Sequence, residues 1–320
     1  MTRHDFLASA AAATGLAGAP PAPSIESAYE LAKPPGTLYG TLTLPSAVRK
    51  PPVVLIIAGS GPTDRDGNSG PTLRTDAYRL LAAALNTRGI ASVRYDKRGI
   101  AASRMAGLSE ADIRFETLID DAVAWLAKLH DDARFGALAI AGHSEGSLIG
   151  MLAAMRAKVA AFVSFEGAGV PAQQGLRRQL APQLAALPSL AAASDRILDA
   201  LAQGHTVADV PDTLQALYRP SVQPYLISWF RYDPRVAIAK VAARTAIVQG
   251  TFDAQIPVAD ARALAAAKPA ATLTIVERMS HVLKDAPDAT LASQINTVYV
   301  NPSLPVDPAV PAAIAAALSL

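Results

Sequence analysis

The sequence contains no cysteine, and this absence excludes three kinds of chemistry at once. Without a thiol the chain has no disulfide, no thiolate metal site and no cysteine nucleophile. Aromatic residues are also scarce, at 5% of the 320 residues, although 51% of the chain is hydrophobic. Much of that hydrophobic content is alanine, which is typical of a helix-rich globular protein with a sizeable core.

An excess of one charge is missing as well, because 29 basic and 27 acidic residues give a net charge of +2. No basic block is present, so we expect no nucleic-acid partner. Beyond the N-terminal stretch, no apolar run approaches 18 residues, and we expect no membrane span. The sequence also lacks a His-Glu-x-x-His motif, a carboxylate cluster at metal spacing and a Gly-x-Gly-x-x-Gly loop. We therefore expect no metal and no cofactor.

The first 24 residues allow two interpretations. A positive start with Arg3 precedes an apolar stretch at residues 7–19 with a small-residue end, which is the layout of a signal peptide for a periplasmic or secreted protein. The same Ala- and Pro-rich segment also fits a disordered tail on a cytoplasmic protein. The sequence leaves both open.

From residue 37 onward, short apolar runs alternate with stretches of helical periodicity. Strands are predicted at 37–44, 52–58, 91–96, 137–141, 160–165, 245–250 and 272–276. Helices are predicted at 73–88, 116–132, 147–155, 258–267 and near the C-terminus. This alternation predicts an α/β fold with a mostly parallel central sheet flanked by helices.

One interval breaks this alternation. Residues 170–240 are helical only in patches, at 179–187, 194–203 and 212–218. A structureless loop of that length is improbable, so we interpret the interval as a helical lid inserted over the sheet. The predicted core then comprises residues 25–169 and 241–320.

The pattern Gly-His-Ser-Glu-Gly at residues 142–146 lies between a predicted strand and a predicted helix. In that context, G-x-S-x-G predicts a nucleophile elbow with Ser144 exposed at the carboxyl edge of the sheet. The turn is so tight that a side chain at either glycine would collide with neighbouring backbone. We expect the adjacent His143 to point away from the site.

A serine hydroxyl needs a base, and the base needs an acid to orient it. Of the five histidines, His281 follows the last predicted strand and opens at the same sheet edge as Ser144. Asp253 follows the strand before it and is the expected acid, with Glu166 as the alternative acid or a pocket residue. The chain order Ser144, Asp253, His281 is that of α/β hydrolases.

The oxyanion hole requires two backbone amides aimed at one point. We assign one to Glu145, which follows the predicted nucleophile. The second comes from the glycine-rich loop after residues 52–58, where Ser60 and Gly61 are both candidates and Ser60 is favoured.

Several motifs together resemble a known family. They are Ser-Gly-Pro-Thr-Asp-Arg-Asp-Gly-Asn at 60–68, Tyr-Asp-Lys-Arg-Gly at 95–99, the elbow at 142–146, Gly-Thr-Phe-Asp at 250–253 and Ser-His at 280–281. The chain resembles the α/β-hydrolase superfamily, and within it bacterial serine esterases of the lysophospholipase and serine-aminopeptidase type. This resemblance implies Ser144, Asp253 and His281 as the catalytic triad.

These observations favour a serine carboxylesterase that acts on a small-molecule ester as a monomer or homodimer. Aromatic residues of the predicted lid, Tyr225, Trp229 and Phe230 among them, are candidate pocket residues. A peptidase, amidase or acyltransferase with the same triad is the alternative, with Asp195, Asp199 or Asp209 as receptors for a substrate amine. A binding protein that keeps the fold without turnover is a third hypothesis.

Overall fold

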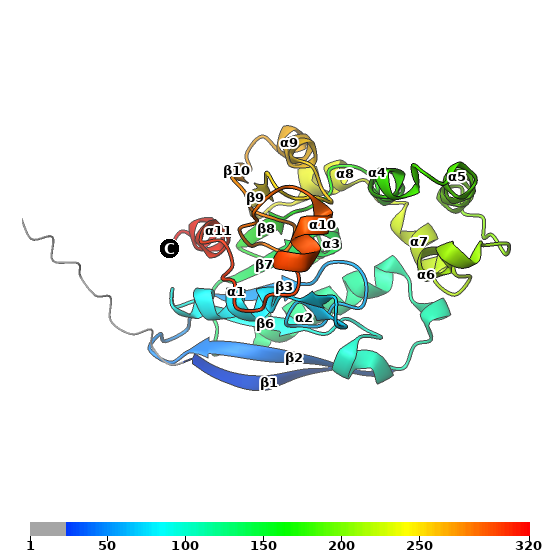
Figure 1. The fold of residues 1–320 in the computed structure, drawn as a ribbon. Helices are drawn as coiled ribbons and strands as arrows, with labels where there is room; N and C mark the ends of the chain where they lie inside the picture. The colour runs from blue at the N-terminus through cyan, green and yellow to red at the C-terminus, as the bar shows by residue number, and fades with distance from the viewer. Residues whose placement is uncertain (1–23) are drawn as a thin grey trace, which may run out of the picture.

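The computed structural model describes residues 24–320, in which strands and helices alternate along the chain (Figure 1). The strands are β1 (Ser24–Lys33), β2 (Gly36–Pro45), β3 (Val53–Ile57), β4 (Asn68–Ser69), β5 (Leu73–Arg74), β6 (Ala91–Tyr95), β7 (Leu138–His143), β8 (Ala161–Phe165), β9 (Arg244–Gly250) and β10 (Thr272–Val276). The α-helices are α1 (Ala77–Asn86), α2 (Phe115–Asp131), α3 (Glu145–Ala154), α4 (Ala172–Leu184), α5 (Pro188–Ala202), α6 (Gln215–Tyr218), α7 (Gln223–Trp229), α8 (Pro234–Lys240), α9 (Val258–Ala267), α10 (Leu291–Thr297) and α11 (Ala309–Leu318). Short 3-10 helices are η1 (Ala101–Met105), η2 (Glu110–Asp112) and η3 (Asp212–Leu214).

Within the described range, the main sheet has eight strands in the order β1-β2-β6-β3-β7-β8-β9-β10. The six strands from β6 to β10 in this order run parallel, and β1 and β2 are antiparallel at one edge. The mostly parallel sheet predicted from the sequence is therefore confirmed. Because parallel strands share a direction, the loops after β3, β7, β8, β9 and β10 all open at one edge.

The central strands are buried on both faces by helices. In β3, Val53, Leu55 and Ile57 belong to the core that includes residues of α2, α3, α8 and α9. The alternate residues Val54 and Ile56 belong to a second core with residues of α1 and α11. Side chains of a strand alternate between faces, so a continuous apolar run is what a sheet covered on both sides requires.

The prediction at the N-terminal edge was incomplete. Residues 37–44 are a strand, as expected, but they pair with β1, which the sequence analysis did not predict. β1 begins at Ser24, the last residue of the segment expected to be a signal peptide or a disordered tail. The residues of β1 alternate between exposed and buried only from Ala28 to Ala32, so the sequence pattern is short. Pairing with β2 defines the rest of the strand. The signal peptide or tail predicted for residues 1–24 otherwise lies outside the described residues.

The helix predicted from residue 73 begins later, at Ala77, because a short β4–β5 hairpin precedes it. The Asn68 side chain accepts a hydrogen bond from the Asp76 amide at 2.9 Å and donates one to the Asp76 carboxylate at 2.7 Å. Asp76 adopts a left-handed conformation with φ of 50°. These side-chain contacts fix a non-helical backbone over residues whose periodicity alone indicates a helix.

The predicted helical insertion at 170–240 holds α4 to α8. Helices α4 to α7 gather at the end of the molecule opposite the C-terminus (Figure 1). They share a small core that includes Ile197, Leu201, Tyr218 and Leu226. Helix α8 instead packs on α3 and α9, with Ile238 in the main core. The helices also begin earlier than predicted, at Ala172, because the polar start of α4 carries no apolar periodicity.

Candidate active site

Ser144 lies in a sharp turn between β7 and α3. Its backbone has φ of 54° and ψ of −120°, a strained conformation for a residue with a side chain. The Ser144 amide is held by the Phe165 carbonyl at 2.9 Å. A Cβ on Gly142 would lie 2.3 Å from the Gly146 carbonyl oxygen, and a Cβ on Gly146 would lie 2.3 Å from that of Ile57. Both glycines are therefore required by close backbone contacts.

His281 and Asp253 form a buried pair at the same sheet edge. His281 Nδ1 and Asp253 Oδ2 are 2.8 Å apart. The other carboxylate oxygen accepts the amides of Gln255 and Ile256 at 2.7 and 2.8 Å. Burial raises the pKa of Asp253, but the adjacent His281 and hydrogen bonds from His281, Glu166 and Ile256 outweigh it and lower the pKa to about 2. Asp253 is therefore an anion aimed at the imidazole.

Glu166 lies behind this pair and not in a pocket, which corrects one prediction. Its side chain is fully buried, accepts the Gly250 amide at 2.9 Å and contacts the Gln249 side-chain amide. Burial, and next the charge of Asp253, hold the pKa of Glu166 well above its usual range. A protonated Glu166 can then donate a hydrogen bond to Asp253, which stabilises that anion. No cavity described below is lined by Glu166.

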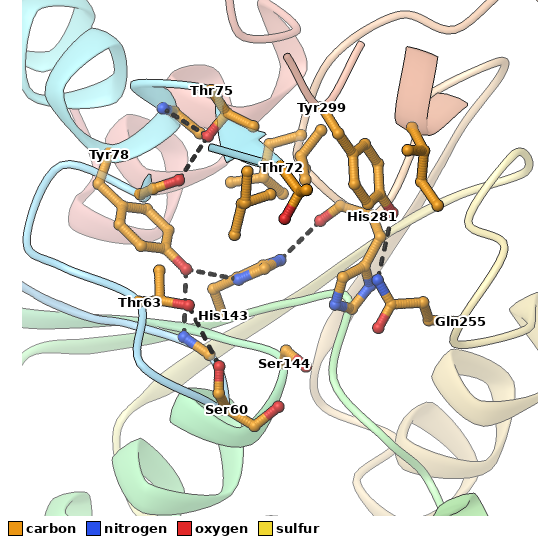
Figure 2. Close-up of a pocket in the computed structure, with 17 residues that line it drawn as sticks. Ser60, Thr63, Thr72, Thr75, Tyr78, His143, Ser144, Gln255, His281 and Tyr299 are labelled. Atoms are coloured by element: carbon orange, nitrogen blue, oxygen red, sulfur yellow. Dashed lines mark hydrogen bonds between the residues drawn. The ribbon is translucent and has the colours of Figure 1, made fainter. Parts of the chain in front are cut away.

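His143 does not point away from the site, contrary to the prediction. Its Nε2 lies 2.7 Å from the His281 carbonyl oxygen, and its Nδ1 lies 2.7 Å from the Tyr78 hydroxyl (Figure 2). The two imidazole rings are 4.8 Å apart. His143 was expected to point away because it lies on the elbow, but contacts with the Tyr78 hydroxyl and the His281 carbonyl hold its ring at the site. His143 braces the loop that carries His281.

A buried ion pair joins the elbow to the neighbouring loops. Lys97 Nζ lies 2.7 Å from Glu145 Oε2 and 2.5 Å from the Gly59 carbonyl oxygen. The Tyr225 hydroxyl of α7 contacts the second Glu145 oxygen. Lys97 and Glu145 are only 4% and 6% exposed, so each charge depends on the other. Lys97 was not predicted as a site residue from the sequence, although its place two residues after β6 at this sheet edge is a usable signal.

The two predicted oxyanion amides belong to the segments that this ion pair joins. Glu145 is the first residue of α3, and Ser60 follows Gly59, whose carbonyl binds Lys97. Within residues 24–320, no hydrogen bond uses the backbone amide of Glu145, Ser60 or Gly61. These amides are available to an incoming oxygen atom. Lys97 thus connects the segments that carry both predicted donors.

Two cavities meet at Ser144. The first, here called the α7 cavity, has a volume of about 520 Å³ and lies among α4, α7 and the elbow. Its lining includes Ser60, Gly61, Ser144, Glu145, Leu148, Leu176, Tyr225 and Trp229. Of the predicted pocket residues, Tyr225 and Trp229 line this cavity. Phe230 does not, because it packs into the core of α4 to α7.

The second cavity, here called the α10 cavity, has a volume of about 430 Å³. It lies between the β4–β5 hairpin, α1, the His281 loop and α10, and Figure 2 shows Ser144 near His143 and His281 in its wall. Its lining includes Ser60, Leu73, Tyr78, His143, Ser144, His281, Leu283, Ile295 and Tyr299. Ser144 and His281 therefore line one shared space.

Neither cavity offers an unpaired carboxylate among the described residues. The charged residues that line the α7 cavity are Glu145, paired with Lys97, and Arg219, paired with Glu110. No Asp, Glu, Lys or Arg lines the α10 cavity. The acidic residues proposed as amine receptors lie elsewhere: Asp195 and Asp199 pair with Arg177, and Asp209 is exposed outside both cavities.

Because His143 is buried, we expect the free energy of unfolding of the protein to depend on pH in the acid range. Burial, followed by the nearby His281, lowers the pKa of His143 from 6.5 to about 3. Between these values the unfolded chain binds a proton that the folded chain does not, so the free energy of unfolding falls as the pH falls from 6.5 towards 3. The slope is about 1.4 kcal/mol per pH unit. Urea unfolding at pH 7.0 and 4.5 measures it. The His143→Gln variant cannot take up this proton. If the free energy of unfolding fell equally with pH in the variant and in the wild type, His143 would not be the group responsible.

The described residues hold no cluster of three or more His, Cys, Asp or Glu side chains that could bind a metal ion. Over the same part of the chain, no helix has the length and apolar content to cross a membrane.

Comparison with known proteins places the chain in a family. The family model described as serine aminopeptidase, S33 matches residues 69–285, more than half of the chain. The chain belongs to this family. Members have the α/β-hydrolase fold that the sheet order and elbow describe, so the protein is a hydrolase of this fold. The family resemblance stated from the sequence motifs is confirmed.

Individual relatives are more distant. Esterase EstD of Thermotoga maritima is 28% identical over 159 residues, which cover 49% of this chain and 36% of EstD. The chain therefore spans only about a third of that relative. The structure of Est1E from Butyrivibrio proteoclasticus is similar over 92% of this chain and 99% of Est1E, with a TM-score of 0.58 and 15% identity. A puromycin-hydrolyzing peptidase of Mycobacterium tuberculosis matches 86% of this chain and 38% of its own, with a TM-score of 0.53 and 17% identity.

Proposed function

We propose that this hydrolase is a serine carboxylesterase, with Ser144 as nucleophile, His281 as base and Asp253 as the acid that orients it. The observation that carries the proposal is the shared wall of the α10 cavity, which is lined by a strained serine and by a histidine whose Nδ1 lies 2.8 Å from a carboxylate. A serine, a base and an oriented acid at one sheet edge are the parts that acyl transfer requires.

The reaction proceeds in two halves. His281 Nε2 accepts the proton of Ser144 as Oγ attacks the ester carbonyl carbon, while Asp253 stabilises the imidazolium through Nδ1. The amide of Glu145 and that of Ser60 or Gly61 hold the developing oxyanion. His281 then gives its proton to the alcohol oxygen, which leaves with the C–O bonding pair. Water activated by the same imidazole hydrolyses the acyl group from Ser144 and restores the enzyme.

The charge of the two cavities supports an ester over an aminoacyl substrate. An aminopeptidase must hold a substrate ammonium group close to the scissile bond, and an unpaired carboxylate serves that purpose best. The only carboxylate in the cavity walls among the described residues is Glu145, and Lys97 and Tyr225 already bind it. We assign α4 to α7 as the lid that covers the substrate. Oligomeric state has no bearing on this assignment, because both cavities are formed within one chain.

The family description makes an aminopeptidase the second candidate, and substrate preference separates the two. We expect kcat/KM for p-nitrophenyl acetate and butanoate to exceed that for aminoacyl p-nitroanilides by at least ~100-fold, since a neutral site leaves the ammonium group unpaired. Labelling by a fluorophosphonate probe, mapped to Ser144 by peptide analysis, accompanies the assay. A preference for the aminoacyl amides would contradict the esterase assignment, and a folded protein that neither labels nor turns over either class would favour a binding role.

A further inference from the structure

The two cavities share the nucleophile and Ser60 but differ in the other parts of the predicted machinery. Ser144 and Ser60 line both cavities. Glu145 and Gly61, which carry predicted oxyanion amides, line only the α7 cavity. His281 lines only the α10 cavity. Ser144 therefore lies at a junction, with Glu145 and Gly61 in the wall of one cavity and the base in the wall of the other.

The chemistry of ester cleavage indicates that the two cavities bind different parts of the substrate. In the tetrahedral intermediate, the former carbonyl carbon bears Ser144 Oγ, the oxyanion, the acyl chain and the alcohol oxygen. His281 must reach that alcohol oxygen to protonate it as the C–O bond breaks. The alcohol group therefore extends towards the cavity that holds His281. The acyl chain extends into the remaining space, on the side of Glu145.

We propose that the α10 cavity binds the alcohol portion of the ester, and that the α7 cavity binds the acyl portion. This assignment rests on the proposed esterase function and extends it to the class of substrate. The substrate is an ester of an uncharged, bulky alcohol with an apolar body, for which Ile295 on α10 is a specificity-determining residue. The reaction itself is unchanged: the alcohol leaves with the proton from Ser144, delivered by His281.

The walls of the α10 cavity select for such an alcohol. No charged side chain lines it, while Leu73, Leu283 and Ile295 supply aliphatic surface. Each of its two aromatic hydroxyls has a partner within the chain. The Tyr78 hydroxyl contacts the Gly59 amide and His143, and the Tyr299 hydroxyl accepts a hydrogen bond from the Gln255 side chain at 3.1 Å. An ionic alcohol would lose its water contacts there and find no charged side chain to replace them.

Ile295 allows the assignment to be tested without a change to the predicted triad or to the oxyanion amides. It is 38% exposed on α10 and lines the α10 cavity, so Ile295→Trp narrows that space. Leu176→Trp narrows the α7 cavity in the same way. Ile275→Trp is the matched control, because Ile275 is 37% exposed on β10 and lines neither cavity.

Two substrate series read out the two cavities. One varies the alcohol of an acetate ester from ethyl to benzyl to 2-naphthylmethyl, and the other varies the acyl chain of an ethyl ester from acetate to octanoate. We expect Ile295→Trp to lower kcat/KM for naphthylmethyl acetate by at least ~10-fold, and to change that for ethyl octanoate less than ~3-fold. Leu176→Trp should lower kcat/KM for ethyl octanoate and leave that for naphthylmethyl acetate nearly unchanged. Ile275→Trp should alter kcat/KM in neither series.

Deacylation supplies a second readout, because all acetate esters pass through the same acetyl-enzyme. Ile295→Trp should leave the acetyl-enzyme hydrolysis rate in rapid-mixing experiments unchanged, since the alcohol has already left. If Ile295→Trp lowered kcat/KM only for esters with long acyl chains, the assignment of the α10 cavity to the alcohol would be overturned. Equal decreases of kcat/KM in both substrate series would also overturn it. A folded wild-type protein that hydrolyses no ester would instead refute the proposed function, so the two failures are distinguishable.

Discussion

Ser144→Ala is expected to lower kcat/KM for p-nitrophenyl acetate by roughly 10⁵-fold, because it removes the atom that forms the acyl-enzyme. The residual rate would come from the oxyanion amides and from substrate binding, which the substitution leaves in place. The fold should survive, since alanine keeps the Cβ and the Ser144 amide still binds the Phe165 carbonyl. Steady-state rates and a thermal melting curve measure the two properties.

Ser147→Ala is the matched control for this experiment. Ser147 is a buried serine three residues along α3, and its hydroxyl lies 2.7 Å from that of Ser164. Its loss removes one neutral hydrogen bond, with a cost of about 1 kcal/mol in stability, and does not reach the cavities. Ester hydrolysis that persists in Ser144→Ala, or a comparable loss in Ser147→Ala, would contradict the assignment of Ser144.

Lys97→Met is expected to lower the free energy of unfolding by about 3–5 kcal/mol. The change leaves the Glu145 carboxylate buried without its cation, and removal of one partner of a buried ion pair has a cost of this size. The Gly59 carbonyl loses a hydrogen-bond donor at the same time. Urea unfolding at pH 7 measures the loss.

A double-mutant cycle separates the ion pair from simple loss of packing. In Lys97→Met combined with Glu145→Gln, no buried charge is left unpaired, and the side-chain oxygen of the introduced glutamine can still accept the Tyr225 hydroxyl. The combined loss should therefore be smaller than the sum of the two single losses by at least ~1 kcal/mol. Additive losses would show that Lys97 and Glu145 do not depend on each other.

The local sequence was sufficient to predict secondary structure wherever neighbouring residues determine the backbone conformation. The apolar run of β3 and the two glycines around Ser144 predicted a buried strand and a tight turn, and both are present. Helix α9 and strand β10 have the bounds that periodicity indicates. The order of strands then placed Ser144, Asp253 and His281 at one sheet edge, because parallel strands all end on the same side.

Contacts between distant segments account for the failures. The β4–β5 hairpin replaced the start of a helix through side-chain bonds across eight residues. Glu166, a polar residue just after β8, was expected at the surface of a pocket but lies beneath Asp253, where Gly250 and Gln249 of β9 bind it. Phe230 lies in the core of α4 to α7 because the neighbouring helices surround it.

The sequence by itself determined the α/β fold, the elbow and the three residues that meet at the sheet edge, since short-range periodicity and strand direction fix these. Only the tertiary structure decided which charges are paired, how His143 is oriented and that two cavities meet at Ser144. Those features depend on which side chains approach from distant parts of the sequence, as Lys97 and Glu145 do across 48 residues and His143 and His281 across 138. A pattern along the chain carries no record of such distances.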